Sequence, residues 1–348
     1  DAVIRGRVLS ANNFTGGIHA ETSIKAKIDM LDLRTGDVLW EIQLADYKTG
    51  YSATLAPLVL DDKVIIGISG GEYATRGFID AYDPATGEQI WRFHTIPALG
   101  DPGSETWPPD PEVLSRGGGG TWMNGSYDPA LNLIYWGVGN PNPDYFGDTR
   151  LGDNLYSNSL VALDADTGEL KWHYQFTPHD LNDWDSNHMP VLADIEWNGQ
   201  ERKVVMVGNR NGFFYVLDSV SGELLLGKPF TATTWAREIG ADGRPIVLND
   251  GSKGCLPDPW GSTNFMPPSF YPDLDLFILT ARETCATFVP EEPRYVTGQS
   301  SFGGVVFIDG EQGSGALRAL DVHTGELRWE FTYPCLLYTS DAADEEDS

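Results

Sequence analysis

The sequence has no long hydrophobic run and few basic residues. No stretch reaches the roughly 18 consecutive apolar residues that a membrane-spanning helix requires, so we expect no membrane span. Lys and Arg number 23 against 51 Asp and Glu, which gives a formal net charge of −28 at pH 7. A surface of that sign repels nucleic acid and anionic membranes, so neither is expected as a partner.

Cysteine is scarce, at three residues in 348, and no Cys-x-x-Cys-His sequence for haem attachment is present. Cys335 opens a terminal segment that resembles the translation of a transposon-end adapter used in sequencing libraries. We therefore predict that 335–348 is a non-native tail and that 1–334 is one domain truncated at both ends; a natural acidic tail is the alternative. The chain begins at Asp1 without Met or a signal peptide, as expected of a mature or truncated N-terminus.

Glycine, proline and aromatic residues are abundant, with 39 Gly, 22 Pro, 11 Trp and 14 Tyr. This composition is typical of an all-β protein with many tight turns. One signature repeats along the chain: Asp is followed four residues later by Gly, and Gly four residues later by Trp or an apolar residue. Its copies begin at Asp32, Asp83, Asp164, Asp218 and Asp321.

Each copy predicts a β-hairpin. The Asp side chain can accept hydrogen bonds from the turn backbone, Gly allows a positive φ, and Trp can dock on a neighbouring unit. A four-stranded sheet cannot bury both faces alone, so the copies are expected to pack as propeller blades, with another meander of hairpins as the alternative. Because the copies lie 51, 81, 54 and 103 residues apart, we expect about six blades, an insertion at about 92–124, and a blade without the signature in the last interval.

An acidic pair stands out between the third and fourth copies. Asp183 and Asp185 flank Trp184, and in an extended segment this spacing places both carboxylates on one side. Two like charges at that distance disfavour each other's ionisation unless a cation or a proton lies between them. The pair therefore indicates a metal ligand, a proton-transfer group or a solvated turn.

Glycine-rich turns provide further candidate contacts. Ser69-Gly70-Gly71-Glu72 follows an apolar strand, and four glycines at 117–120 precede Thr121 and Trp122. No Lys follows the second run, so a phosphate loop is disfavoured and close approach of the backbone to a flat ligand is preferred. Trp122 fits either the floor of that ligand site or the core of a blade. Asn140, which precedes Pro141, is a turn residue or an oxygen ligand.

These motifs, in this order, resemble the pyrroloquinoline quinone (PQQ)-dependent alcohol dehydrogenases, the methanol and ethanol dehydrogenase family. The resemblance covers residues 1 to about 334 and implies an all-β, eight-bladed propeller, incomplete here. It also implies that a primary alcohol is oxidised to an aldehyde by hydride transfer to PQQ, with a metal ion as Lewis acid.

The resemblance assigns roles to individual residues. Asp183 matches the catalytic base of the family. Asp185 matches a carboxylate of lanthanide-dependent members that calcium-type methanol dehydrogenases lack, which favours a lanthanide(III) ion over Ca²⁺ because a trivalent ion needs more oxygen ligands and negative charge. The implied metal ligands are Glu72, Asn140, Asp183 and Asp185, and the implied PQQ contacts are Arg5, Thr54, Ser69, Gly70, Gly71, Trp122, Arg210 and Asn264.

The implied partners are a small alcohol and a c-type cytochrome that accepts electrons, in the periplasm, with a homodimer as a further expectation. Cys255 and Cys285 match a family disulfide, while two free thiols are the alternative. The adjacent cysteine pair of the family would precede Asp1. A non-catalytic propeller scaffold of the outer-membrane assembly type shares the Trp repeat, but it has no reason to carry Glu72 and Asp183 together.

Overall fold

A computed structural model describes residues 2–6, 26–248 and 256–333, and the side chains within 26–248, 256–308 and 313–333. Nearly all regular structure is β-strand, as predicted. No helix in these ranges is long and apolar enough to cross a membrane. The helical elements are short: η1 (Tyr47–Thr49), η2 (Gly71–Tyr73), η3 (Ser104–Thr106), α1 (Pro111–Ser115) and η4 (Pro272–Leu274).

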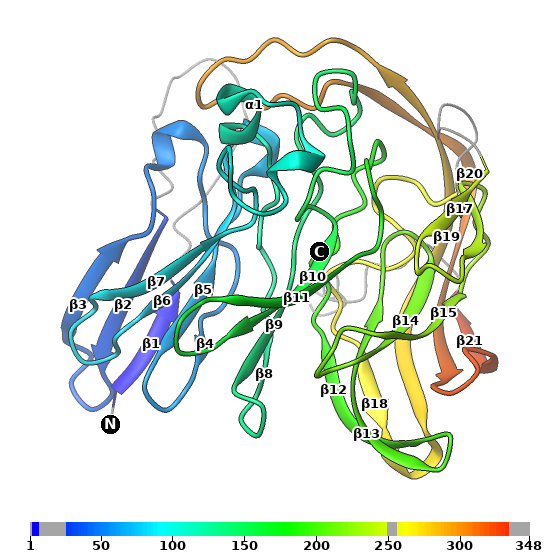
Figure 1. The fold of residues 1–348 in the computed structure, drawn as a ribbon, viewed down its shortest axis with the longest axis horizontal. Coiled ribbons are helices and arrows are strands. Elements are labelled where there is room, and N and C mark those ends of the chain that lie inside the picture. Colours follow the sequence, from blue (N-terminus) through cyan, green and yellow to red (C-terminus); the bar gives the residue numbers. More distant parts are fainter. Residues whose placement is uncertain (1, 7–25, 249–255, 334–348) are drawn as a thin grey trace, which may run out of the picture.

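The strands form antiparallel sheets that follow one another in chain order, like the blades of a fan (Figure 1). The first sheet contains β1 (Ala2–Gly6), β2 (Lys27–Asp32) and β3 (Val38–Gln43). The second contains β4 (Leu58–Val59), β5 (Val64–Gly67), β6 (Phe78–Tyr82) and β7 (Gln89–His94). The third contains β8 (Ser126–Asp128), β9 (Leu133–Gly137), β10 (Ser159–Asp164) and β11 (Leu170–Gln175).

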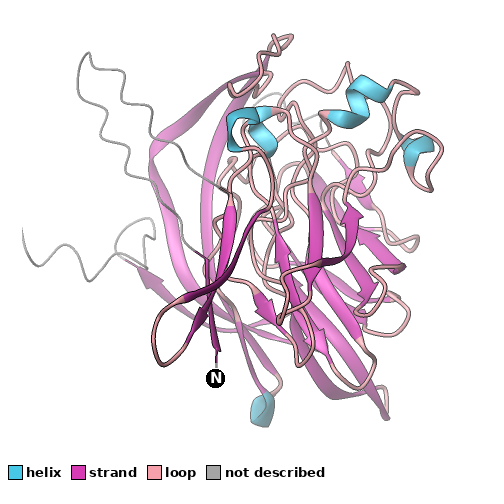
Figure 2. Ribbon diagram, turned by 90° about the vertical axis from the view of Figure 1, so that its left-hand side faces the viewer, coloured by secondary structure: helices cyan, strands magenta, loops and turns pink. Residues whose placement is uncertain are grey.

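Two further blades complete the described fan. The fourth contains β12 (Val191–Trp197), β13 (Gln200–Gly208), β14 (Phe213–Asp218) and β15 (Leu224–Pro229). The fifth contains β18 (Ser269–Tyr271), β19 (Leu276–Pro290), β20 (Gly304–Asp321) and β21 (Leu327–Tyr333). Figure 2 shows these strands from the side, with most of the helical turns beyond one end of the sheets.

The repeated signature forms the turn between the last two strands of every blade. In the first copy, the Asp32 side chain accepts hydrogen bonds from the backbone N–H groups of Arg34 and Thr35, both at 2.8 Å. The other four Asp residues make the equivalent bonds. The signature glycines all have positive φ, from 70° to 76°. The predicted hairpin chemistry is therefore confirmed.

The signature tryptophans join one blade to the next. Trp40 donates its indole N–H to the Pro84 carbonyl, Trp91 to Ala165 and Trp172 to Ser219, each at 3.0 Å. Each acceptor directly follows the signature Asp of the next blade, so the same contact recurs across three interfaces. Apolar side chains fill the space between the sheets, where Val64, Ile65 and Trp136 are fully buried. The predicted propeller packing is confirmed.

The long interval before the fifth signature differs from the prediction. We expected it to hold a blade without the signature, but its described part holds only a two-stranded sheet, β16 (Ala236–Ile239) with β17 (Pro245–Val247), besides strands of the flanking blades. Much of its length is taken up by β19 and β20, which pair from Leu276–Asp321 to Pro290–Gly304. The described chain thus has five blades and one additional small sheet. The insertion expected near 92–124 is present between β7 and β8 and carries η3 and α1.

The connection between β19 and β20 crosses the molecule. This segment, 291–303, is orange in Figure 1 and runs from the fifth blade over the top toward the second. The Ser301 N–H donates to the Glu72 carbonyl at 2.6 Å, and the Tyr145 N–H donates to the Phe302 carbonyl at 2.9 Å. The segment therefore links loops of the second, third and fifth blades above the fan.

Candidate cofactor and metal site

Loops from all of these blades except the first line one cavity of about 460 Å³. Every predicted metal ligand and every predicted PQQ contact except Arg5 lies on its wall. The wall consists of Ser52, Thr54, Ser69, Gly70, Gly71, Glu72, Gly120, Trp122, Asn140, Asp144, Asp183, Asp185, Arg210, Trp260, Asn264, Phe265 and Phe302.

The loop that carries Asp183 and Asp185 is held by buried polar contacts below it. The Asp180 carboxylate accepts hydrogen bonds from the backbone N–H groups of Asn182 at 3.0 Å and Trp184 at 2.8 Å. Asp183 has a left-handed backbone with φ of 62°, so the segment is not a regular extended strand. Even so, both carboxylates reach the cavity, and Trp184 is fully buried on the other side.

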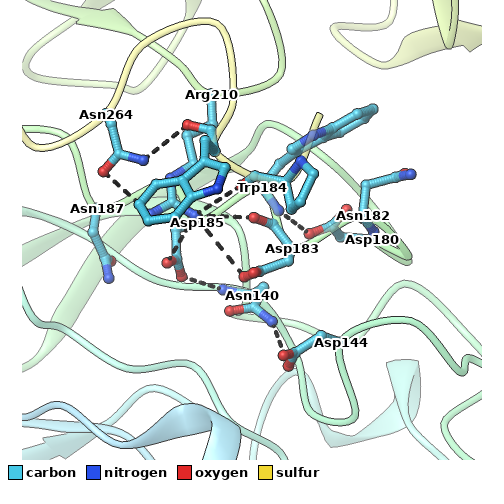
Figure 3. A network of polar contacts seen from close by, with 12 residues as sticks. Asn140, Asp144, Asp180, Asn182, Asp183, Trp184, Asp185, Asn187, Arg210 and Asn264 are labelled. Atoms are coloured by element: carbon cyan, nitrogen blue, oxygen red, sulfur yellow. Dashed lines mark hydrogen bonds and ion pairs between the residues drawn. The ribbon is translucent and has the colours of Figure 1, made fainter. Parts of the chain in front are cut away.

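Asp185 is the most heavily bonded carboxylate of the site (Figure 3). It accepts hydrogen bonds from the Trp122 indole N–H and from the Asn140 backbone N–H, both at 2.9 Å. The Arg210 Nη1 lies 3.3 Å from Oδ2, the same carboxylate oxygen that accepts from Trp122. Asp185 therefore connects the predicted ring floor, the predicted amide ligand and the predicted quinone contact.

Among the described side chains, Arg210 is the one cation on the cavity wall. Its Nη1 donates to the Asp183 carbonyl at 3.0 Å and lies 3.9 Å from the Asp183 carboxylate, while its Nη2 donates to Asn264 Oδ1 at 3.3 Å. Its Nε is buried and meets no acceptor among the described residues. A buried donor without an acceptor is costly, so this N–H indicates a ligand oxygen in the cavity.

Two glycines leave room for a flat ligand. A β-carbon at Gly71 or Gly120 would meet no described atom closer than 3.5 Å and would project into the cavity. At Gly118, by contrast, it would lie 2.7 Å from the Asn142 backbone nitrogen, so packing of the protein itself requires that glycine. Of the run at 117–120, only Gly120 lines the cavity, although close approach of the backbone to a ligand was predicted for all four.

The cavity contains excess negative charge. Burial raises the pKa of Glu72, with a contribution from Asp185. Burial and the Asp144 and Asp185 charges raise the pKa of Asp183 well above its ordinary value, and Arg210 offsets this in part. A cation placed between such groups favours their ionised forms. In the described ranges, no three acidic, His or Cys side chains converge closely enough to form a ready-made metal site.

The remaining predicted contacts divide into three cases. Thr54 bonds Ser69 through their hydroxyl groups at 2.9 Å and donates to the Trp122 carbonyl at 3.1 Å, so it supports the cavity wall. Arg5 lies in β1 opposite Asp29, but its side chain is outside the described part. Cys285 lies in β19, while Cys255 is outside the described residues, so the disulfide stays a prediction.

Five cavity residues were not predicted as site residues, and one of them is Ser52, two positions before Thr54. Asp144 is a buried carboxylate four positions after Asn140. Trp260, Phe265 and Phe302 are 55%, 44% and 42% exposed and form an aromatic mouth. The acidity of Asp144 was visible in the sequence, but nothing local indicates that its loop turns inward. Trp260 and Phe265 lie on the connection before β18 and Phe302 lies on the distant β19–β20 connection, and the three share no motif.

A family model for the β-propeller domain of glucose, ethanol and alcohol dehydrogenases, designated PQQ, matches residues 31–228. The chain belongs to this family.

Characterised family members align along most of the chain. The quinoprotein alcohol dehydrogenase PedH of Pseudomonas putida is 35% identical over 94% of the chain and 59% of its own length. The lanthanide-dependent methanol dehydrogenase of Methylacidiphilum fumariolicum is 34% identical over 89% of the chain and 55% of its length. A europium-containing methanol dehydrogenase superposes with a TM-score of 0.84 at 32% identity, covering 89% of this chain and 59% of that one. The chain thus spans just over half the length of these relatives.

Proposed function

We propose that the protein is a PQQ-dependent alcohol dehydrogenase that oxidises a primary alcohol to an aldehyde with a lanthanide or calcium ion bound beside the quinone. The observation that carries this proposal is the convergence of Asp183, Asp185, Asn140 and Arg210 on one cavity backed by Trp122. A non-catalytic scaffold has no use for this arrangement, and the family match does not favour it.

The residues present fit both groups. A flat, electron-poor ring system suits a cavity whose wall combines the indole of Trp122 with open backbone at Gly71 and Gly120. The unpartnered Nε–H of Arg210 is available to a quinone oxygen. Oxygen atoms of carboxylates and an amide, without Cys or His, suit a hard cation.

Glu72, Asn140, Asp183 and Asp185 would hold the cation, and Ser69, Gly70, Thr54, Arg210 and Asn264 would contact PQQ. When bound, PQQ accepts the hydride, and the cation polarises its reactive carbonyl as a Lewis acid. Asp183, half-buried and facing the cavity, takes the hydroxyl proton of the alcohol as general base. Arg210 supplies positive charge where negative charge develops during the reaction.

The aromatic mouth of Trp260, Phe265 and Phe302 offers apolar surface to the hydrocarbon part of an alcohol. It also limits the access of water to the proton-transfer site. The electron acceptor in this proposal is a c-type cytochrome, and the compartment is the periplasm, as in the family that the sequence resembles.

The preference for a lanthanide rests on Asp185 and on the names of the relatives. Its carboxylate lies on the same cavity wall as Asp183, Asn140 and Glu72. Two relatives are described as a lanthanide-dependent and a europium-containing methanol dehydrogenase. A second inward carboxylate in the segment 183–185 suits a trivalent ion better than a divalent one.

Replacing the proposed base tests this function. In protein loaded with PQQ and a light lanthanide, we expect Asp183→Asn to lower the kcat for dye reduction by alcohols by about 10²–10⁴. The exposed Asp148→Asn variant, on the loop that follows Asn140, serves as the control. The quinone absorption band should remain in Asp183→Asn. Full activity of this variant would refute the role of Asp183.

A second variant tests the choice of metal. We expect Asp185→Ala to lose activity with lanthanides, because the ion loses a ligand and the Asn140 backbone N–H and the Trp122 indole N–H lose their acceptor. If the unmodified protein is active with calcium alone, and Asp185→Ala leaves that activity unchanged, the lanthanide assignment is wrong.

A further inference from the structure

Asp144 has no role in the ligand set above, yet it lies on the same cavity wall. We propose that Asp144 is a fourth carboxylate of the cation site, which orients the Asn140 amide and raises the preference for trivalent over divalent ions. This inference rests on the proposed function, because it requires a cation beside the quinone.

The position of Asp144 is fixed by burial and by one short contact. The residue is 2% exposed, and its Oδ1 accepts a hydrogen bond of 2.8 Å from the Asn140 Nδ2 (Figure 3). The two residues are four apart on one loop of the third blade, and both line the cavity.

The contact determines which end of the Asn140 amide faces the cavity. An ionised carboxylate only accepts hydrogen bonds, so it must face the NH₂ group of the amide. That NH₂ group also donates to the Pro141 carbonyl at 3.3 Å, and the amide oxygen is thereby left for a cation. Partners of this kind commonly orient the ligands of protein-bound metals.

The backbone around Asp144 is anchored independently of any ion. The fully buried Arg150 donates to the Pro143 carbonyl at 2.9 and 3.1 Å, and to the Asp144 carbonyl at 3.4 Å. These bonds hold the loop through its backbone and leave the Asp144 carboxylate itself without an ion pair among the described side chains. Arg150 acts on the Asp144 carboxylate only at longer range, so this buried charge has no direct partner, and a bound cation would lower the cost of burying it.

The net charge of the cavity wall favours a trivalent cation. With Glu72, Asp144, Asp183 and Asp185 ionised, Arg210 leaves three net negative charges on the wall. Coulomb attraction grows in proportion to the charge of the ion, so each carboxylate favours a trivalent over a divalent cation. Removing Asp144 should therefore weaken the binding of both ions, and it should weaken the binding of the trivalent ion more.

The test measures binding and not turnover. Terbium(III) luminescence excited through tryptophan reports on ions near Trp122, whose indole N–H contacts Asp185, and calcium affinity follows from competition. If Asp144→Asn lowers the affinity for Ca²⁺ about tenfold, the same loss of charge should lower the affinity for Tb³⁺ about thirtyfold. The Coulomb energy between the carboxylate and the ion scales with the ionic charge. Asp144→Ala should lower the affinity for both ions further, because the Asn140 amide then loses the hydrogen bond that orients it.

Three controls separate the possible outcomes. Asp148→Asn removes an exposed charge nearby and should leave both affinities unchanged. Trp122→Phe should reduce the sensitised signal and leave the contributions of Trp184 and Trp260. Asn140→Ala combined with Asp144→Ala should cost less than the sum of the single changes, because the two act through one contact. If Asp144→Asn proves unstable in thermal unfolding, Asp144→Ser provides the same comparison.

Two results would overturn the inference. Wild-type Tb³⁺ and Ca²⁺ affinities in Asp144→Asn would show that Asp144 does not belong to the site. Equal losses for the two ions would show that it does not set the preference. Absence of sensitised terbium signal in the unmodified protein would instead refute the metal site in the proposed function.

Discussion

At the scale of single residues, two buried charged side chains, Arg150 and Asp180, hold the loops below the cavity. Arg150 is fully buried and bonds mainly to backbone carbonyls, including those of Pro143 and Asp180. Asp180 in turn caps the N–H groups of the loop that follows it, and burial raises its pKa to about 6. Two charged side chains that do not line the cavity thus position two of the loops that carry its acidic residues, those of Asp144 and of Asp183 and Asp185.

His94, at the end of β7, gives a pH-dependent prediction. Burial, together with the charges of Arg76 and Arg92, lowers its pKa to about 4, and its ring packs edge-on against Phe78. An unfolded His titrates at about 6.5. Between these values the unfolded chain binds a proton that the folded chain does not, so His94 lowers stability as pH falls from about 6.5 to 4.

His94→Gln should therefore flatten the acid side of the stability profile by up to about 1.4 kcal/mol per pH unit in that window. Urea unfolding of both proteins at pH 7 and pH 5 measures the effect. An identical loss of stability on acidification in the two proteins would contradict the prediction.

At the scale of elements, the blade interface depends on a glycine as well as on a tryptophan. Gly168 has φ of +70°, and a β-carbon there would lie 2.6 Å from the Trp91 ring of the preceding blade. Gly222 stands in the same relation to Trp172, again at 2.6 Å. The signature Gly thus permits the turn and also leaves space for the indole that docks on it.

Gly168→Ala and Gly199→Ala separate these two roles. Gly199 lies in the β12–β13 hairpin at φ of +79°, and no described atom lies within 4 Å of its would-be β-carbon. We expect both variants to lose stability through the positive φ, and Gly168→Ala to lose roughly 1–3 kcal/mol more because the interface is overpacked. Chemical denaturation checks this difference, and equal losses would show that the docked Trp tolerates the methyl group.

At the scale of the whole molecule, several blades contribute to one acidic cavity in a chain of net charge −28. Trp122 and Asn140 come from the third blade region, and Asn264 precedes the fifth blade. Asp183 precedes the fourth blade, and Arg210 lies within it on the β13–β14 connection. The connection 291–303 adds Phe302 from above. A ligand in this cavity would therefore contact loops from several blades at once.

Ligand binding should for this reason stabilise the protein as a unit. A light lanthanide with PQQ at 100 times the dissociation constant should add about 2.7 kcal/mol to the free energy of unfolding and raise Tm by several degrees. Thermal unfolding with and without the two ligands, and with a chelator, measures the shift. Asp148→Asn should show the same shift, whereas an unchanged Tm in the unmodified protein would count against binding.

The sequence by itself determined the features that depend on short separations or on an exact repeat. The Asp turn, the positive-φ Gly and the docking Trp recur because each blade makes the same contacts with the next. The predicted contacts from Thr54 to Asn264 came from motifs and from the family resemblance, and all of them line one cavity, while their roles stay predictions.

Only the tertiary structure decided the features that depend on distant contacts. The interval before the last signature had length enough for another blade, but its residues form a small sheet and the long β19–β20 pair. Asn142 donates to the Ser301 carbonyl across 159 positions, and no local pattern encodes that pairing. The inward position of Asp144 depends on the buried anchor Arg150, so its place beside Asn140 became visible only when the loop was folded. Local chemistry thus predicts turns and repeats, whereas the full set of charges around the cavity depends on long-range packing.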